Sequence, residues 1–472
     1  MGSGRDFAQN DTQVCRKKQG KTNRLQWQSK KERGQIKNME HKYLPTFGKA
    51  YFMVVAVLMY YFLTEVIDFG LYITYRHVFA LILFVSAFFV FLYKPNIARG
   101  TVSFKATLIY CMPLLITLMA SLFIWFVGQV DTSVISRGLS SSFVYNNMIS
   151  FTLAAVAFLY IFGEKGMWYN LIAILIANLL MILTIIAQNG IGVFFSELIT
   201  LIVTFADETG EVIVQAEIHE LAFCLGAYLI YMLLKPRKDL TYLILLGLTL
   251  FCFVAAFKRI GIVAIVLALA LGWPLRWIAK FKKDIAMRII VVFTVLLAMV
   301  LIGYIWIIKM DIFSVLEKIG INTSGRANIY NAVDKFYEFS PEFLGNGIGF
   351  LTYQLSTYMN IGVNSVHNDF LQYFVDLGFW GYILWLISMT ILRVCYFGGK
   401  GKTENAIIAF TLTVYLVIVS LTDNTLNYPL FTTAIAILMI GPGFDERVRN
   451  AEMKLFGHVS DANKNTGGDS LL

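Results

Sequence analysis

Long apolar runs alternate with short polar links along most of the chain. The runs are about 17 to 25 residues long, enough for a helix to cross the roughly 30 Å of hydrocarbon in a bilayer. Because the hydrocarbon offers no partner to backbone polar groups, such runs are expected to be α-helices. The pattern therefore predicts an all-α polytopic membrane protein with about twelve transmembrane helices. The predicted spans are 50–66, 75–93, 106–127, 146–163, 169–188, 218–235, 241–257, 260–278, 288–308, 369–393, 404–422 and 426–443.

Composition supports the membrane assignment. The chain of 472 residues is 58% hydrophobic and 15% charged, with a mean hydropathy of +0.67. Soluble domains carry about 25% charged residues, so this balance is that of a membrane protein. The five cysteines lie apart without metal-ligand spacing, which indicates neither a disulfide framework nor a zinc site.

The net charge of +9 follows the predicted topology rather than a nucleic-acid surface. Basic residues concentrate in the N-terminal tail and in every second link, as the positive-inside rule predicts for cytoplasmic segments. The basic links predicted to lie inside are 94–105, 235–238, 280–288 and 393–402. The links predicted to lie outside are those around Asp131, 207–211 and 311–368, so both termini are predicted to be cytoplasmic. We expect the lipid bilayer as a partner and no nucleic acid.

Both ends of the chain are polar. Residues 1–46 form a basic tail that is predicted to be cytosolic; it lacks the apolar core of a cleavable signal peptide, and Met39 is an alternative start. Residues 444–472 are predicted to be a disordered cytosolic tail. The apolar segment 194–205 is too short to cross a bilayer and is predicted to be interfacial or re-entrant.

The longest hydrophilic segment, 322–369, belongs mostly to a large extracytoplasmic loop, 309–368, predicted between the ninth and tenth spans. Polar groups are tolerated at the membrane surface and costly within hydrocarbon, so we expect a site here. Ser324 is a good N-cap, and the helical rhythm after it predicts that Gly325 and Arg326 open a helix. A helix N-terminus beside an arginine can hold phosphate, although a capped surface helix with a solvated arginine is also common.

Three glycines follow Pro341, at positions 345, 347 and 349. They neither follow a predicted strand nor contain GK[ST], so neither dinucleotide nor P-loop binding is indicated. The cluster predicts a turn that lets backbone pass close to a neighbour or a ligand.

Lys258 and Arg259 lie in a turn so short, FKRIG, that they are expected at the outer ends of two spans. Such charges can snorkel to water or to lipid head groups. Together with Arg326, however, they favour an anion site, because a guanidinium matches phosphate oxygens bidentately.

His367 is the only histidine in the hydrophilic segment, and it lies at the start of the tenth span. A neutral imidazole there could take a proton from a hydroxyl near pH 7, although a lone interfacial histidine is more often a structural hydrogen-bonding group. Asn368 and Asp369 beside it could cap the helix. His219 and Glu220, at the outer end of the sixth span, form a second candidate acid/base pair. No two histidines have metal-ligand spacing, so we expect no catalytic metal and no cofactor.

The chain resembles the O-antigen ligase/polymerase family in an ordered set of motifs: FKRIG, SGR-x-x-IY, PEFLGNGIG and VHNDFLQYFVDLGFWG. The resemblance implies a GT-C-like fold, with N-terminal transmembrane helices in residues 47–239 and an O-antigen ligase/polymerase-like domain in 240–443. It also implies a bacterial plasma-membrane enzyme that acts, without a metal, on glycans linked to undecaprenyl diphosphate in the outer leaflet. By the same resemblance Arg259 and Arg326 match arginines proposed to hold the diphosphate, and His367 matches a histidine proposed to activate the acceptor. Lys258 stands where many members are expected to carry a serine.

The resemblance predicts a metal-independent, inverting membrane glycosyltransferase. Its first form is a polymerase that joins lipid-linked oligosaccharide repeat units into O-antigen, capsule or exopolysaccharide, with a chain-length regulator as an expected partner. A ligase that moves finished glycan onto lipid A or a protein is the alternative within the family. A transporter or flippase would also explain the spans and arginines, but it favours polar residues at mid-span rather than at the outer rim.

Overall fold

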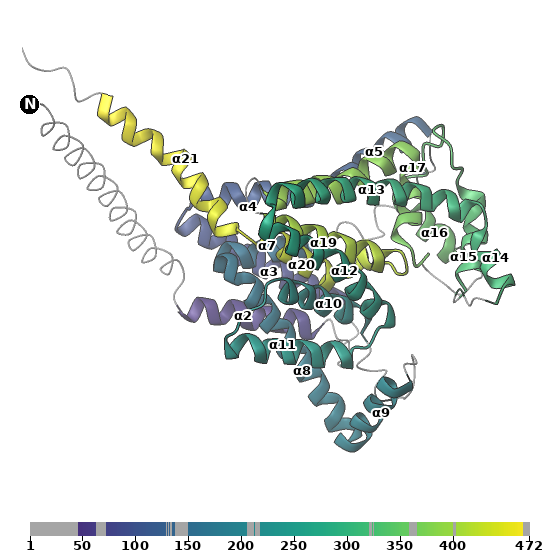
Figure 1. Ribbon diagram of the computed structural model, residues 1–472, viewed down its shortest axis with the longest axis horizontal. Helices are drawn as coiled ribbons and strands as arrows, with labels where there is room; N and C mark the ends of the chain where they lie inside the picture. Colours follow the sequence, from purple (N-terminus) through teal and green to yellow (C-terminus); the bar gives the residue numbers. More distant parts are fainter. Residues whose placement is uncertain are drawn as a thin grey trace, which may run out of the picture. The chain divides into compact units, whose positions relative to one another are not determined.

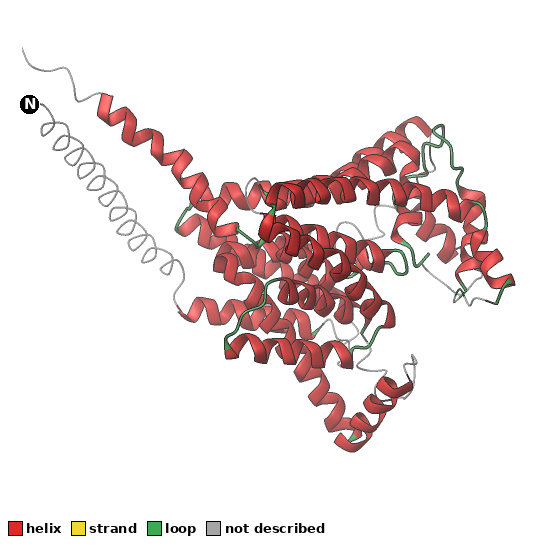
Figure 2. Ribbon diagram, viewed as in Figure 1, coloured by secondary structure: helices red, strands yellow, loops and turns green. Residues whose placement is uncertain are grey.

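The computed structural model describes residues 46–62, 72–128, 130, 132, 135–136, 150–204, 212, 218–320, 323, 325–357, 366–399 and 403–465. Every regular element in these ranges is helical and none is a strand (Figure 2), which confirms the predicted all-α class. The α-helices are α2 (Thr46–Tyr61), α3 (Tyr72–Tyr93), α4 (Ile97–Tyr110), α5 (Met112–Gly128), α7 (Ser150–Phe162), α8 (Gly166–Asn189), α9 (Ile191–Thr204), α10 (His219–Leu234), α11 (Leu240–Ala255), α12 (Arg259–Phe281), α13 (Lys283–Lys309), α14 (Ile312–Lys318), α15 (Arg326–Val333), α16 (Phe350–Thr357), α17 (Asp369–Ile387), α18 (Arg393–Gly398), α19 (Thr403–Ser420), α20 (Pro429–Ile440) and α21 (Phe444–Asn465).

Several of these helices can cross a membrane. Within the described ranges, five helices are long and apolar enough, and the bent pair α4–α5 would make a sixth. Six shorter apolar helices of 10–17 residues accompany them. Each predicted span overlaps a helix, so the multi-pass character is supported, while the count of twelve spans stays a prediction.

The centre of the bundle is formed by α10, α12, α19 and α20, which pack against one another (Figure 1). Small residues allow close approach of helices where hydrocarbon surrounds them. Gly272 of α12 faces Thr411 of α19, whose Oγ1 would lie 2.6 Å from an added Cβ, and Gly226 of α10 faces both Tyr415 and Ile265. Gly272, late in α12, therefore lies beside Thr411, early in α19. Ile265, earlier in α12, lies near Tyr415, later in α19. The two helices are antiparallel, and the start of α12 lies at the end of α19.

Links that the charge pattern assigns to the cytoplasmic side do gather at one end of this bundle, here called the Asp445 end. Arg99, in the link region 94–105, approaches Asp445 at 3.4 Å, just after α20. Lys235 approaches Glu164 at 3.7 Å, in the turn between α7 and α8. The backbone N–H of Glu164 donates to Asp445 at 3.0 Å, so these four segments form one cluster. The grouping of links follows the predicted alternation; which end faces the cytoplasm stays a prediction.

The sequence predicts that Arg393 lies in the inside link 393–402. It lies in a helix instead, because the helix that begins at Asp369 continues to Gly398. A π-helical turn, η5 (Ser388–Leu392), precedes it, and Arg393 is only 1% exposed. Its Nε donates to the carbonyl of Tyr110 at 3.1 Å, and the guanidinium lies 4.0 Å from the centroid of the Tyr110 ring. Tyr110 ends α4 at a bend of 52°, where the last carbonyls lack helical partners. The arginine therefore provides a hydrogen-bond donor to a backbone carbonyl at the bend between α4 and α5.

The predicted glycine turn is confirmed, and its neighbour is α17. This helix is interrupted at Gly378, where φ is 70° and ψ is −175°. The backbone N–H groups of Asn346 and Gly347 donate to the carbonyl of Asp376 at 3.1 and 2.8 Å, and the Phe379 N–H donates to Phe343 at 2.9 Å. The turn thus fills the interruption in the helix.

The carboxylate of Asp376 holds the second half of the same turn. It is 2% exposed and accepts hydrogen bonds from the backbone N–H groups of Gly349, at 3.0 Å, and Leu351, at 3.2 Å. These N–H groups lie at the start of α16, where a helix lacks internal acceptors. Asp376 therefore fastens the segment between α15 and α16 to the membrane helix α17.

The C-terminal segment 444–472 was predicted to be disordered, and this is wrong for its first part because α21 runs from Phe444 to Asn465. Asp445 and Glu446 lie in the first turn, where negative charge complements the helix dipole, and Glu452 accepts a hydrogen bond from Asn96 at 3.2 Å. The predicted tail 1–46 lies outside the described residues except for Thr46. The short apolar segment 194–205 is mostly α9, which has 14 residues and is too short to cross a bilayer.

Glu220, predicted as half of an acid/base pair, caps α20 in the structure. One carboxylate oxygen of this half-buried side chain accepts a hydrogen bond from the backbone N–H of Leu430, in the first turn after Pro429. That N–H is one of those a helix start leaves without an internal acceptor.

Gly345→Ala is expected to destabilise the fold. Gly345 has φ 93°, and an added Cβ would lie 2.5 Å from the Leu377 carbonyl carbon and 2.7 Å from the Asp376 oxygen. The left-handed conformation alone costs about 1–3 kcal/mol for a residue with a side chain. Thermal unfolding of the detergent-purified protein measures the loss. Gly303→Ala, in α13 with no atom within 4 Å of the added Cβ, is the matched control and should unfold at or above the wild-type temperature, because Ala favours a helix more than Gly does. Equal midpoints for both variants would contradict the docking role.

Glu220→Ala should lower the free energy of unfolding by about 1 kcal/mol, the usual value of a lost N-terminal cap. Glu220→Gln keeps an acceptor oxygen and should unfold near the wild-type temperature. Product formation in cells distinguishes the two roles: if the stable Gln variant loses activity, Glu220 acts as an acid or base and the capping interpretation is insufficient.

Candidate functional site

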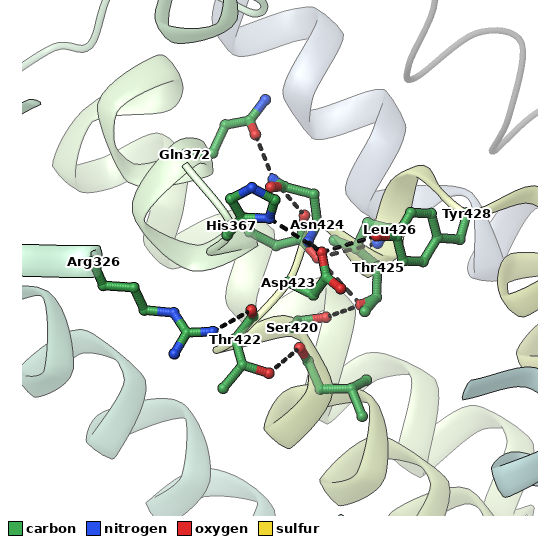
Figure 3. Close-up of polar contacts among 12 residues, drawn as sticks. Arg326, His367, Gln372, Ser420, Thr422, Asp423, Asn424, Thr425, Leu426 and Tyr428 are labelled. Carbon is green, nitrogen blue, oxygen red and sulfur yellow. Dashed lines mark hydrogen bonds and ion pairs between the residues drawn. The ribbon is translucent and has the colours of Figure 1, made fainter. Parts of the chain in front are cut away.

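Three segments that are distant in sequence meet at the end of the bundle opposite Asp445, here called the Asp423 end. They are the start of α15, the residues just before α17, and the link 421–428 between α19 and α20 (Figure 3). Arg326 donates through Nη2 to the carbonyl of Thr422 at 2.8 Å. His367 Nδ1 lies 3.5 Å from Oδ1 of Asp423. Since consecutive Cα atoms are about 3.8 Å apart, the two predicted site residues are held by neighbouring residues of one link.

Arg326 is the first residue of α15, as predicted, but the cap is different from the predicted one. The N-cap position is Gly325, with φ 77°, and the hydroxyl of Thr323 accepts a hydrogen bond from the Ala327 N–H at 3.3 Å. Ser324 lies outside the described residues. A glycine takes this backbone conformation without the cost that a side chain would impose.

The guanidinium of Arg326 is only partly engaged. Its Nε–H is buried and has no hydrogen-bond partner among the described residues. Buried donors are almost always satisfied, so an unsatisfied one requires an explanation. An anion bound at the start of α15 would supply the missing acceptor, since guanidinium groups bind phosphate oxygens in pairs.

His367 projects from the link into α17 in a constrained backbone conformation. Its φ is 50°, one of two positive values for non-glycine residues in the described part of the chain. Such values cost about 1–3 kcal/mol and are often found at functional sites. The side chain is 48% exposed, so one ring nitrogen faces Asp423 while the rest of the ring is accessible.

Asp423 is a buried carboxylate with defined partners, only 6% exposed. Oδ1 accepts hydrogen bonds from the hydroxyl of Tyr428 at 2.9 Å and from the backbone N–H of Asn424 at 2.8 Å. Burial, and then the negative charge of Asp423, raises the pKa of Tyr428, so this hydroxyl stays protonated and donates at neutral pH. The carboxylate is thereby fixed in direction toward His367.

Asn368 and Asp369, at the start of α17, hold the segments around the site by hydrogen bonds. Asn368 caps α17, as predicted, by accepting a hydrogen bond from the Leu371 N–H at 3.1 Å, and its amide donates to two tyrosine hydroxyls, those of Tyr304 and Tyr330. Asp369 does not cap the helix. Its carboxylate, 1% exposed, accepts hydrogen bonds from the link 421–428, namely from the Leu426 N–H at 3.1 Å and from the hydroxyl of Thr425 at 3.3 Å.

Arg259 lies at the same end as Arg326 and His367. It is the exposed first residue of α12, and Lys258 before it is half-buried. A Cβ added at Gly261 would lie 3.8 Å from the ring of Phe223, and that ring stacks on Tyr428 with 6.3 Å between centroids. The start of α12 is therefore next to the link that carries Asp423.

Of the second candidate pair, Glu220 lies beside this group. It caps α20 at Leu430, and its charge acts on Tyr428. The side chain of His219, at the start of α10, lies outside the described residues. Within the part of the chain that the structure describes, no group of three or more His, Cys, Asp or Glu residues could hold a metal ion.

Sequence reasoning missed Asp423 and the link around it. The signal was present: alternation of the predicted spans puts 422–426 on the same side as the loop 309–368. Asp423 and Asn424 are the polar pair in that short link. What the sequence does not give is the folding of α19 and α20 that places the link against α17.

The comparisons with known proteins concern the same part of the chain. Residues 241–386 match a family model described as O-Antigen ligase. The match covers less than half of the chain and includes Arg259, Arg326 and His367, but ends before Asp423. A search of the curated proteins found no match. Over residues 241–386 the chain is therefore similar to the O-antigen ligase family, and the helices of this stretch are those that carry or adjoin Arg259, Arg326 and His367.

Proposed function

We propose that the protein is a membrane glycosyltransferase that polymerises polyprenyl-diphosphate-linked oligosaccharide repeat units into a surface polysaccharide on the outer face of the plasma membrane. The observation that carries the proposal is the convergence of Arg326 and His367 on the consecutive residues Thr422 and Asp423. This arrangement places a partly engaged guanidinium beside an accessible imidazole that faces a buried carboxylate.

The leaving group in such a reaction is a lipid diphosphate. When the bond between the anomeric carbon and the diphosphate oxygen breaks, the oxygen keeps the electron pair, and negative charge builds on the phosphates. Preorganised cations and dipoles stabilise such charge and usually provide the largest catalytic contribution. Arg326, with its unsatisfied Nε–H, is assigned to this charge, and Arg259 at the start of α12 is assigned with it. Lys258 adds positive charge beside them.

The nucleophile is a sugar hydroxyl, which needs a base. In this proposal His367 donates its Nδ1–H to Asp423, 3.5 Å away, so that Nε2 is the nitrogen that acts as the base. Nε2 takes the hydroxyl proton as the oxygen attacks the anomeric carbon from the side opposite the diphosphate. One direct displacement of this kind inverts the anomeric centre.

The choice of a polymerase over a ligase rests on the greater number of polymerases in the family. Geometry does not separate the two, since both reactions use the same donor. The acceptor hydroxyl belongs to another lipid-linked repeat unit in a polymerase and to lipid A or a protein in a ligase. Deletion of the gene separates them. A polymerase mutant makes single repeats on the acceptor, whereas a ligase mutant accumulates free lipid-linked polymer, which would overturn the polymerase assignment.

Substitution of Arg259, Arg326 or His367 by Ala should abolish long chains and leave single lipid-linked repeats to accumulate. The reason is the loss of diphosphate stabilisation or of the base, each typically worth a factor of about 10² or more. Glycolipids extracted from cells and separated by length give the measurement, with protein levels checked on the same samples. Lys335→Ala removes another exposed cation from the same loop and is the control, expected to make full-length polymer. Full-length polymer in all three site variants would exclude this site.

Asp423→Asn should reduce the polymerisation rate by about 10²–10⁴-fold, the usual contribution of general-base catalysis. The variant keeps an oxygen for Tyr428 but loses the charge that orients His367. Because the two residues act as a unit, adding His367→Ala should reduce the rate little further. Glu338→Gln, an exposed acid of the loop, should keep wild-type activity. Additive losses in the double variant would show that Asp423 does not act through the histidine.

A further inference from the structure

A pocket lies at the Asp445 end, away from the candidate site at the Asp423 end. It has a volume of about 280 Å³ and lies between the start of α8, the link after α10 and the start of α11. Phe223 near the start of α10 stacks on Tyr428, whereas Lys235 follows the end of that helix. Since Lys235 comes 12 residues after Phe223, a rise of 1.5 Å per residue separates the two regions by about 18 Å.

The mouth of the pocket carries positive charge. Lys165 and Arg237, both exposed, line it, and the guanidinium of Arg237 lies 5.1 Å from the centre of the Trp168 ring. This stacking holds the group in place while leaving its N–H donors directed outward. No carboxylate within ion-pair distance of Arg237 occurs among the described residues.

The nearby acidic groups are already engaged. Asp239, which also lines the pocket, caps α11 by accepting the Tyr242 N–H at 2.8 Å. Glu164 pairs with Lys235 at 3.7 Å. Arg276 of α12 lies close enough to Tyr242 to act on it electrostatically and adds a further positive charge. The pocket thus has an excess of cations whose natural ligand is an anion.

The rest of the lining is apolar and aromatic. Trp168, Tyr169 and Ile172 come from α8, and Tyr242 and Leu245 come from α11. Both helices are apolar, and α11 exposes Leu240, Leu243 and Ile244, so the pocket joins a basic link to a surface suited to lipid. Aromatic side chains of this kind are typical of the level of lipid head groups.

We propose that this pocket binds the head group of an anionic phospholipid, with the phosphate at Arg237 and Lys165 and the acyl chains along α8 and α11. A soluble phosphate compound shares the anionic chemistry, but it would leave the wall of Trp168, Ile172 and Leu245 without a partner. The charge at the mouth and the apolar wall beside it fit one amphipathic ligand. The site is independent of the glycosyl-transfer chemistry at Asp423.

The test is native mass spectrometry of the full chain, purified in detergent and titrated with phosphatidylglycerol or phosphatidylcholine. One phosphatidylglycerol should be retained in preference to phosphatidylcholine. Arg237→Gln should weaken this binding about tenfold, since one charge-assisted contact is worth roughly 1.4 kcal/mol or more. Arg237→Lys, which keeps the charge and loses the planar fork, should lose less, and it maintains the test if the Gln variant fails to fold.

Arg288→Gln is the matched control, because it removes an exposed arginine from the second turn of α13 without touching the pocket. Equal loss of phosphatidylglycerol binding in this control would show that only the total positive charge matters, and it would overturn the proposal. Equal retention of the two lipids would also overturn it. Displacement of phosphatidylglycerol by inorganic phosphate at the same concentration would assign the pocket to a soluble phosphate instead.

Discussion

The buried carboxylate of Asp369, at the start of α17, fixes the geometry on which the candidate site depends. Burying a carboxyl group costs free energy unless hydrogen-bond partners surround it, and here the partners come from the link between α19 and α20 and from Ser420 at the end of α19. The Leu426 N–H and the Thr425 hydroxyl contact it directly, and Asn424 Nδ2 lies 3.5 Å away. Any displacement of the link would leave these groups unsatisfied. As a result, Thr422 and Asp423 are presented to Arg326 and His367 in one orientation.

Asp376 extends the same principle two helical turns along α17. Residues seven apart lie on the same face of a helix, so the two carboxylates point in similar directions. Asp369 holds the link 421–428, and Asp376 holds the glycine turn before α16. A membrane helix with two buried acids thereby joins two irregular segments that would otherwise carry unsatisfied backbone N–H groups. The interruption at Gly378 gives the glycine turn room to enter.

The two ends of the bundle differ in the chemistry of their positive charge. At the Asp423 end, Arg326 has a buried donor without a partner and lies beside an exposed imidazole, which suits a charged substrate that must react. At the Asp445 end, Arg99 and Lys235 lie within 4 Å of acids, and Arg237 stacks on an aromatic ring. The acids and the arginine that are buried along the helix 369–398, Asp369, Asp376 and Arg393, are each hydrogen-bonded to backbone groups, which offsets the cost of placing them there.

The sequence by itself determined the all-α membrane class, the position of each apolar helix, and the identity of Arg259, Arg326 and His367 as candidates, because hydropathy and local capping signals act over a few residues. It also indicated the glycine turn, though not that α17 is its neighbour. Only the tertiary structure decided that Arg393 is buried against Tyr110, that Glu220 caps α20 and that Asp423 contacts His367. Each of these contacts joins residues between 56 and 283 positions apart, and packing of whole helices sets such contacts. Local sequence cannot encode which helix ends meet, since that depends on how apolar faces and small residues fit together.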